Sequence, residues 1–431
     1  MPSYLAALSV AAALLSGAAL AQAPVPPQLD SLTLSAAEKL VVERNRDVQR
    51  ARRAIEASQA DVVAAGAAPN PVVTLGAGMV NPQSGVGKAA IPGGARIEQL
   101  IERGNKRELR VETAKRLESA AGADLAEALR QQRLAAVSAY FDLLLAQDQL
   151  ATAEVMADLF RKTVDATERR LKAGDVAQAD LSRLRVDALR AENEVRSAEA
   201  DRRRAQNALA YLIGAERQAG SIRATDAWPA TGEAVQAVVD DAMLDRRPDV
   251  AAARERMEAA NKARELARSL ATRDVTVGAG IDRTPPSETN TMGTGTLVGV
   301  SVSFPLFLRY TYEGEIARAE AEYTAAMELL DLTRAQARTE LSTALSDLGA
   351  AADRLRRYEA SLLAEAQKAA DYAEYAYRNG AIGVIDLLDA RRTLRAVTLD
   401  AAAARADYAK ALARWRSGLT EIDAVAEKTR P

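Results

Sequence analysis

The chain has 431 residues, with 57 Lys and Arg against 59 Asp and Glu, and it contains neither His nor Cys. It can therefore build no imidazole or thiolate metal site, no Ser-His-Asp triad and no disulfide, and its net charge of -2 gives no overall basic excess for binding nucleic acid. Alanine supplies 95 residues and aromatic residues only 4%, which is typical of long helices that pack closely together. We expect no catalytic residue, no metal site and no cofactor.

Residues 1–23 predict a secretory signal peptide. They carry no charged side chain, and small-x-small patterns place the cleavage site after Ala21 or Ala23. The usual Lys or Arg near the start is missing, so an uncleaved anchor helix is the alternative. Beyond this segment no stretch approaches ~18 uninterrupted apolar residues, so a mature chain that crosses a membrane would cross it with strands.

A strand pair is predicted at about residues 72–99. In Val72–Val80 one face holds Val73, Leu75, Ala77 and Met79, while the other holds Thr74, Gly76 and Gly78. The return strand, from Ile91 to Gln99, is much less clear in the sequence. A Gly-, Pro- and Asn-rich loop separates the two.

Proline is absent between residues 92 and 229 and again between residues 305 and 431. Because proline breaks helices, both tracts predict uninterrupted helices. A continuous helix from Asn105 to Lys172 would be roughly 100 Å long. The second tract carries Leu and Ala at heptad spacing, which predicts coiled-coil-like packing; examples are Leu341, Leu345, Leu348, Ala352, Leu355 and Leu362.

The second half of the chain repeats the plan of the first, which predicts an internal duplication with repeats at 24–228 and 229–431. Three stretches match in order, the first two at an offset of 202 and the last at 206: Arg44–Ala57 with Arg246–Ala259, Thr74–Gly78 with Thr276–Gly280, and Lys172–Leu181 with Arg378–Leu387. The second copy therefore holds extra residues between its last two landmarks. The alternative is that Ala-, Glu- and Arg-rich helices resemble one another through composition alone.

The second strand pair is predicted at about residues 274–304, with Val298, Val300, Val302 and Phe304 on one face. Four strands cannot close a barrel, and open sheet edges are not tolerated inside lipid. A membrane segment would therefore require several chains to pool their strands, and three chains would supply twelve. The alternative is two hairpins packed on a helical domain in water, because alternation looks the same in both cases.

Several motifs resemble one known family, the TolC-type outer membrane factors, over essentially the whole mature chain. The family motifs are RRPDV at Arg246–Val250, FPLF at Phe304–Phe307 followed by EGEIARAEAEY at Glu313–Tyr323, and NGAIGVIDLLDARRTL at Asn379–Leu394. The chain is most similar to the subgroup that serves heavy-metal (cobalt-zinc-cadmium) efflux, through residues 68–78, 99–107 and 305–319. It departs from that subgroup at Leu308–Gly314, where a shorter polar stretch is usual.

The resemblance implies a mainly α fold with a small β part. Long antiparallel helical hairpins would form a trimeric α-barrel, and four strands per protomer would contribute to a 12-stranded transmembrane β-barrel. The chain would lie in the outer membrane, with a periplasmic helical extension. It would be no enzyme but the passive exit duct of a tripartite efflux pump for heavy-metal cations, with a periplasmic adaptor and an inner-membrane resistance-nodulation-division pump as partners. A drug-efflux duct, a type I secretion duct and a soluble periplasmic coiled-coil adaptor are the alternatives.

The resemblance also implies the places where the helical hairpins turn. The tips are expected near residues 174 and 380, at Gly174 and Asp175 in the first repeat and at Gly380 and Ala381 in the second. Glycine permits the positive φ that a tight helix reversal needs. An adaptor would dock at these tips.

The remaining site residues implied by the resemblance form a gate beside the second tip. Asp386 and Asp389 share a helical face, and in a trimer they would form carboxylate rings that select cations. Tyr377 and Asp180 match positions that latch neighbouring helices together in the family. The third latch position, commonly basic, is Ile382 in this chain.

Overall fold

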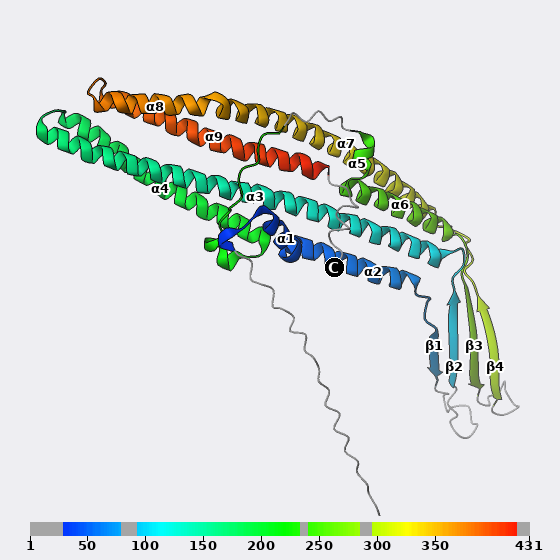
Figure 1. The fold of residues 1–431 in the computed structure, drawn as a ribbon. Coiled ribbons are helices and arrows are strands. Elements are labelled where there is room, and N and C mark those ends of the chain that lie inside the picture. Colours follow the sequence, from blue (N-terminus) through cyan, green and yellow to red (C-terminus); the bar gives the residue numbers. More distant parts are fainter. Residues whose placement is uncertain (1–28, 79–92, 233–239, 285–294, 420–431) are drawn as a thin grey trace, which may run out of the picture.

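The computed structural model describes residues 29–78, 93–232, 240–284 and 295–419. It consists mainly of α-helices, with one four-stranded antiparallel sheet (Figure 1), so the predicted fold class is confirmed. The predicted signal peptide, residues 1–23, lies outside the described residues. None of the described helices combines the length and the hydropathy needed to cross a membrane.

The elements follow the same order in both halves of the chain. The first half contains α1 (Leu34–Arg44), α2 (Arg46–Gly66), β1 (Val72–Ala77), β2 (Gly93–Ile101), α3 (Lys106–Ala173) and α4 (Gln178–Ile213), with short 3-10 turns η1 (Leu29–Ser31) and η3 (Glu216–Ser221). The second half contains α5 (Asp241–Asp245), α6 (Pro248–Ser269), β3 (Val275–Thr284), β4 (Gly295–Ser303), α7 (Glu313–Arg357), α8 (Leu363–Arg378) and α9 (Val384–Gly418).

The longest helix, α3, has 68 residues and matches the helix expected from the first proline-free tract. Its counterpart in the second half is divided, because a π turn, η4 (Tyr358–Leu362), separates α7 from α8. The N–H of Leu363 donates to the carbonyl of Tyr358, which is the wider hydrogen-bond spacing of a π turn.

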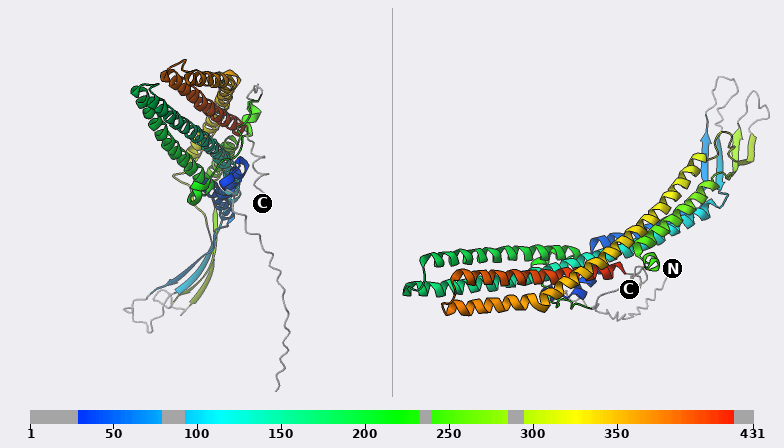
Figure 2. Two further views of the ribbon diagram at one scale, coloured as in Figure 1. Left: turned by 60° about the vertical axis from the view of Figure 1, so that its left-hand side comes forward. Right: turned by 90° about the horizontal axis from the view of Figure 1, so that it is seen from above.

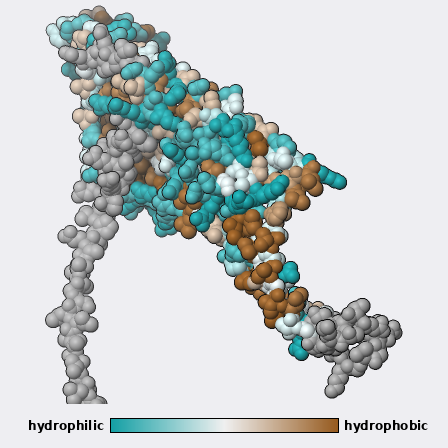
Figure 3. Space-filling model, turned by 90° about the vertical axis from the view of Figure 1, so that its right-hand side faces the viewer, coloured by the Kyte–Doolittle hydropathy of each residue, from teal (hydrophilic) through white to brown (hydrophobic). Residues whose placement is uncertain are grey.

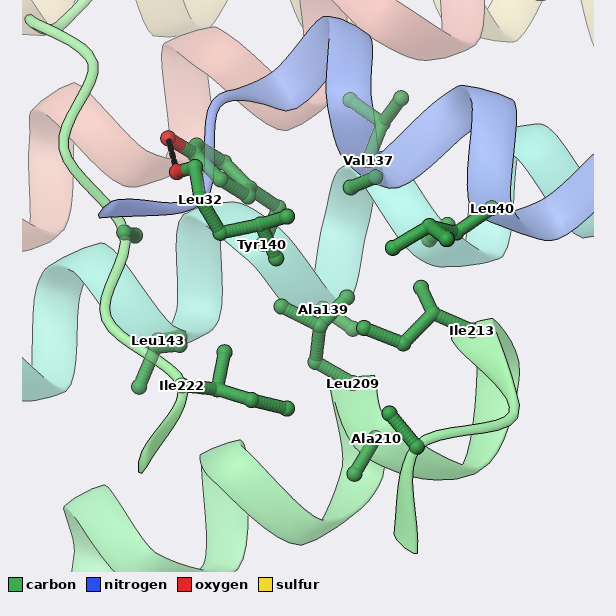
Figure 4. Close-up of a cluster of buried hydrophobic side chains, with 14 of the residues drawn as sticks. Leu32, Leu40, Val137, Ala139, Tyr140, Leu143, Leu209, Ala210, Ile213 and Ile222 are labelled. Atoms are coloured by element: carbon green, nitrogen blue, oxygen red, sulfur yellow. Dashed lines mark hydrogen bonds between the residues drawn. The ribbon is translucent and has the colours of Figure 1, made fainter. Parts of the chain in front are cut away.

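The hairpins α3–α4 and α8–α9 extend side by side to one end of the molecule, and the sheet lies at the other (Figures 1 and 2). Helices α2, α3, α6 and α7 lead toward the sheet. Between the two ends, α1 packs on α3 and α4 around buried Tyr140 (Figure 4), whose hydroxyl lies 3.0 Å from the carbonyl oxygen of Leu32. Burial raises the pKa of Tyr140 to about 12, so the phenol stays neutral.

The extra residues of the second half of the chain lie where the sheet meets the helices. Residues 102–105 join β2 to α3, whereas the longer segment 304–312 joins β4 to α7. Strand β2 ends at Ile101 and β4 ends at Ser303. These ends are separated by the same offset, 202 residues, as the first two matching stretches of the sequence. The insertion therefore lengthens a connection and leaves the strands in register.

The sheet order is β1-β2-β3-β4, and its register separates an apolar from a polar face. Facing residues of adjacent antiparallel strands share a face. One row on the apolar face runs Val73, Ile97, Ala279, Val300. Neighbouring rows on the polar face hold Thr74, Arg96, Gly280 and Gly299, and Val72, Glu98, Gly278 and Ser301.

The apolar face is exposed along the strands. Val298, Val300 and Val302 stand in the open, and Figure 3 shows hydrophobic side chains along the sheet beside a largely hydrophilic helical body. The part of the predicted first strand pair in residues 79–92 lies outside the described residues. The strand alternation therefore points its apolar side chains away from the protein core.

Candidate functional site

Both helical hairpins reverse at a glycine in the left-handed conformation. Gly174 has φ 85° and Gly380 has φ 71°. In each turn the glycine N–H and the next N–H, those of Asp175 and Ala381, donate to carbonyls of the last helical turn at 2.8–3.1 Å. This is a Schellman motif. A Cβ at either glycine would meet nothing within 4 Å, so backbone conformation alone favours glycine there.

Asp386 and Asp389 lie in the first turns of α9, directly after the second tip. One carboxylate oxygen of Asp386 accepts a hydrogen bond from the N–H of Gly383 at 3.2 Å, which caps the start of the helix. Asp389 is exposed and has no hydrogen bond or ion pair with any other described residue. Asp386 therefore has a structural role within one chain, whereas Asp389 is free to act on a ligand or a neighbouring copy.

Tyr377 joins the two hairpins, although not through Asp180. Its hydroxyl lies 3.3 Å from the hydroxyl of buried Thr167 on α3, and the guanidinium of Arg170 lies 5.3 Å from its ring centroid. Asp180 instead pairs with Arg183, at 3.5 Å between Oδ1 and Nη1. Within one chain the structure does not bring the two expected latch residues together.

Two polar contacts between the hairpins could not be predicted from the sequence. Arg392 on α9 donates to both carboxylate oxygens of largely buried Asp187 on α4, at 2.8 Å each. Arg391 beside it is buried and donates to the hydroxyl of Thr163 on α3 at 2.6 Å. Burial lowers the pKa of Arg391, and its contact with Glu374 offsets part of this shift. No spacing rule reports which residues of separate helices meet.

The RRPDV motif supplies a buried charge network in the helical body. The Arg247 side chain is 1% exposed, and its Nη2 lies 2.8 Å from Asp249 and 2.7 Å from Glu340. Glu340 also accepts from Arg130 at 3.2 Å, which connects α3, α6 and α7. Burial alone would raise the pKa of Asp249, but its bond to Arg247 outweighs this and holds that pKa below its usual range.

Neither end of the molecule presents a metal-binding cluster among the residues that the structure describes: no three Asp or Glu side chains gather closely enough to hold an ion. The tip therefore offers glycine turns, exposed carboxylates and links between hairpins. Such groups can dock a partner, select ions and hold two hairpins together.

Long helical hairpins that lead from such tips to a sheet with an exposed apolar face are the architecture of an outer membrane channel. The family model described as "Outer membrane efflux protein" matches residues 39–215 and 240–419, and the chain belongs to this family. The expected family, the efflux function and the outer membrane location are thereby confirmed.

Known proteins are similar to the chain in sequence and in fold. It is 28% identical over 374 residues to the cobalt-zinc-cadmium resistance protein CzcC of Cupriavidus metallidurans, and the match covers 84% of each chain. The outer membrane channel CmeC of Campylobacter jejuni has the same fold, with a TM-score of 0.79, 14% identity and coverage of 92% of this chain and 88% of that one. The outer membrane protein VceC of Vibrio cholerae gives a TM-score of 0.73 at 21% identity, covering 90% and 96%.

Proposed function

We propose that the chain is the exit duct of a tripartite efflux pump and that it works as a homotrimer. Family membership supports efflux through the outer membrane. The observation that carries the association of several copies is the open sheet, in which β1 and β4 each pair on one side only among the described strands; the number three follows the family resemblance. Three copies would pool twelve strands and close these edges. The exposed apolar face would then meet lipid, and the polar face would line the lumen.

The helical hairpins would continue this lumen into the periplasm. A periplasmic adaptor would dock at the turns around Gly174 and Gly380, and an inner-membrane resistance-nodulation-division pump would supply the energy. The duct itself would carry out no bond chemistry. Two repeats, 24–228 and 229–431, following a cleaved segment at 1–23, are part of this proposal.

Heat-modifiable trimers in isolated outer membranes test the assembly. We expect a species that migrates as a trimer in unheated samples and as a monomer after boiling. Recovery of the chain as a monomer in the soluble periplasmic fraction would instead favour a soluble coiled-coil adaptor.

Heavy-metal cations are the proposed cargo, and the similarity to a cobalt-zinc-cadmium resistance protein supports them. Deleting the gene should then sensitise cells to cobalt, zinc or cadmium more than to drugs, and the intact gene on a plasmid should restore resistance. Sensitivity to drugs alone would instead identify a drug-efflux duct.

The proposed gate consists of carboxylate rings at Asp386 and Asp389 and a latch at Tyr377 and Asp180. Because Tyr377 contacts Thr167 within one chain, its bond to Asp180 would form on rearrangement of the tip or with a neighbouring copy. We expect Tyr377→Phe to raise the resting conductance of trimers in planar bilayers. Tyr375→Phe, at an exposed tyrosine of the same helix, is the matched control. Equal resting conductance in both variants would remove Tyr377 from the latch.

A further inference from the structure

Residues 304–312 (FPLFLRYTY), the connection from β4 to α7, form an apolar lip at the base of the sheet. Phe304, Leu306 and Leu308 are exposed, and Leu308 is 84% exposed. The preceding strand carries exposed Val300 and Val302 on its apolar face, and the strand alternation places Phe304 on that same face. The lip thus continues the apolar surface to the point where the hydrophilic helices begin.

The equivalent connection in the first repeat, residues 102–105, has the opposite character. Glu102 forms a two-point ion pair with Arg110, at 2.5 and 2.9 Å. Gly104 packs so tightly that a Cβ there would lie 2.9 Å from the side chain of Thr272. This turn is polar although Arg103, Gly104 and Asn105 are exposed, so of the two connections only residues 304–312 form an apolar lip.

The lip is an ordered turn. The Tyr310 hydroxyl accepts a hydrogen bond from the N–H of Gly314 at 3.0 Å and lies beside the Glu315 carboxylate. The rings of Phe307 and Tyr312 meet edge to face, with centroids 5.4 Å apart. Tyr312 has φ 69°, a left-handed conformation that is costly for a bulky residue. The turn therefore presents its apolar side chains without first having to be ordered by a partner.

Two arginines accompany these apolar side chains. Arg309 is exposed and has no hydrogen bond or ion pair with any other described residue, while the Arg273 guanidinium lies 5.7 Å from the Phe307 ring centroid. Aromatic and basic residues at the end of an apolar surface are typical of a membrane–water boundary. An arginine at this boundary can bind the phosphate of a lipid headgroup, because its planar guanidinium can donate two parallel hydrogen bonds to the phosphate oxygens.

We propose that the lip binds the phospholipid leaflet on the helical side of the membrane. Phe304, Leu306 and Leu308 enter the acyl region, and Arg309 binds the phosphate of an anionic headgroup. This inference rests on the proposed function, because it requires the sheet to lie in lipid. Each protomer then holds the leaflet beside β4.

Tryptophan quenching by brominated lipid tests the insertion. The full-length chain, reconstituted in vesicles of equal parts phosphatidylcholine and phosphatidylglycerol with brominated acyl chains, is compared as wild type, Leu308→Trp, Val300→Trp and Leu329→Trp. The wild type gives the background of the two native tryptophans. Leu329 is an exposed leucine of α7 and serves as the control outside lipid. We expect the added emission to be lost at positions 300 and 308 and retained at 329.

The possible results distinguish failure of the lipid-binding proposal for the lip from failure of the proposed function. Loss of emission at 300 but not at 308 would overturn the lip and leave the membrane sheet intact, and it would point to a protein partner for this surface. Retention of emission at both 300 and 308 would overturn the lip together with the proposed membrane position of the sheet.

The headgroup is tested by brominating one lipid at a time. We expect Leu308→Trp to lose more emission when phosphatidylglycerol carries the bromine than when phosphatidylcholine does. Adding Arg309→Gln should equalise the two losses, whereas adding Arg103→Gln, at the exposed arginine of the first-repeat connection, should preserve the difference. An unchanged preference with Arg309→Gln would overturn the assignment of Arg309 to the headgroup.

Discussion

At the scale of single residues, the two halves of the chain differ at the position that precedes helix α2 in the first half and helix α6 in the second. Asn45 caps α2 in the first repeat, accepting from the N–H groups of Asp47 and Val48 at 2.9 and 3.2 Å. The equivalent residue before α6 is Arg247, a buried cation that requires two carboxylates. The hydrogen bonds to the neutral Asn45 side chain form at any pH. The ion pairs of Arg247 form only while the carboxyl groups of Asp249 and Glu340 are charged.

This difference predicts a pH-dependent stability. Because the folded-state pKa of Asp249 is lowered, its stabilising contribution is present above its unfolded pKa of about 4 and is lost as pH falls through the folded value. We expect Asp249→Asn to lower the melting temperature of the detergent-solubilised protein at neutral pH, with the gap to wild type closing in acid. Asp47→Asn, at the equivalent first-repeat position, is the control and should cost less. A gap that is the same at every pH would contradict the assignment.

A second residue-scale prediction concerns ion selectivity. Asp386→Asn with Asp389→Asn should reduce the cation preference of trimers in planar bilayers, because a ring of carboxylates attracts cations at a constriction. The asparagine at 386 keeps an oxygen that can cap α9, so the fold should be maintained. Asp400→Asn, at an exposed residue farther along the same helix, is the matched control. Equal selectivity in the double variant and the control would remove the rings from the gate.

At the scale of elements, the two halves of the helical body differ in continuity. Helix α3 runs without interruption, whereas its counterpart contains the π turn at Tyr358–Leu362. A π turn interrupts the regular hydrogen-bond spacing of an α-helix, and such turns are rare and often occur at functional sites. We therefore expect α8 to be joined to α7 through a more compliant segment than the equivalent part of α3, whereas α9 runs into the body without a break.

Hydrogen exchange measures this difference within one molecule. Amides of residues 358–362 should exchange faster than those of residues 151–155, which occupy the equivalent place along α3, because local opening costs less free energy at the π turn. Peptide-resolved mass spectrometry of the full-length protein provides both values from the same sample. Equal rates in the two segments would show that the π turn adds no compliance.

Several elements were predictable from the sequence because their signals are local. Proline-free tracts predict α3, and alternation predicts β3 and β4, whereas the glycine turns at Gly174 and Gly380 were implied by the family resemblance. The capping by Asp386 was readable too, because an acid three residues after a helix start is a known capping pattern. By contrast, the pairing of Arg392 with Asp187 joins residues far apart in sequence, and the π turn has no sequence pattern of its own.

At the scale of the whole molecule, the two faces of the sheet are suited to different surroundings. Val300 and Ser301 are neighbours in β4, yet the register places Val300 on the apolar face and Ser301 on the polar one. If the apolar face meets lipid, a charge on it must be buried in hydrocarbon, whereas a charge on the polar face stays in water.

These adjacent residues therefore predict opposite outcomes for one substitution. Val300→Arg should cost about 2–4 kcal/mol per protomer in lipid and reduce the yield of heat-modifiable trimers in the outer membrane. Ser301→Arg should be tolerated and alter conductance instead. Equal trimer yields for both variants would contradict the assignment of the faces.

The strands contribute no residue to any of the buried apolar clusters that the structure describes, all of which lie in helices and their connections. The helical body can therefore fold in water, because it has its own apolar core. The sheet has no such core and cannot bury its apolar face in water. We therefore expect the helical body to fold in water and the sheet to form only with other copies and lipid. Until then, the exposed valines of the strands would make the chain prone to aggregation.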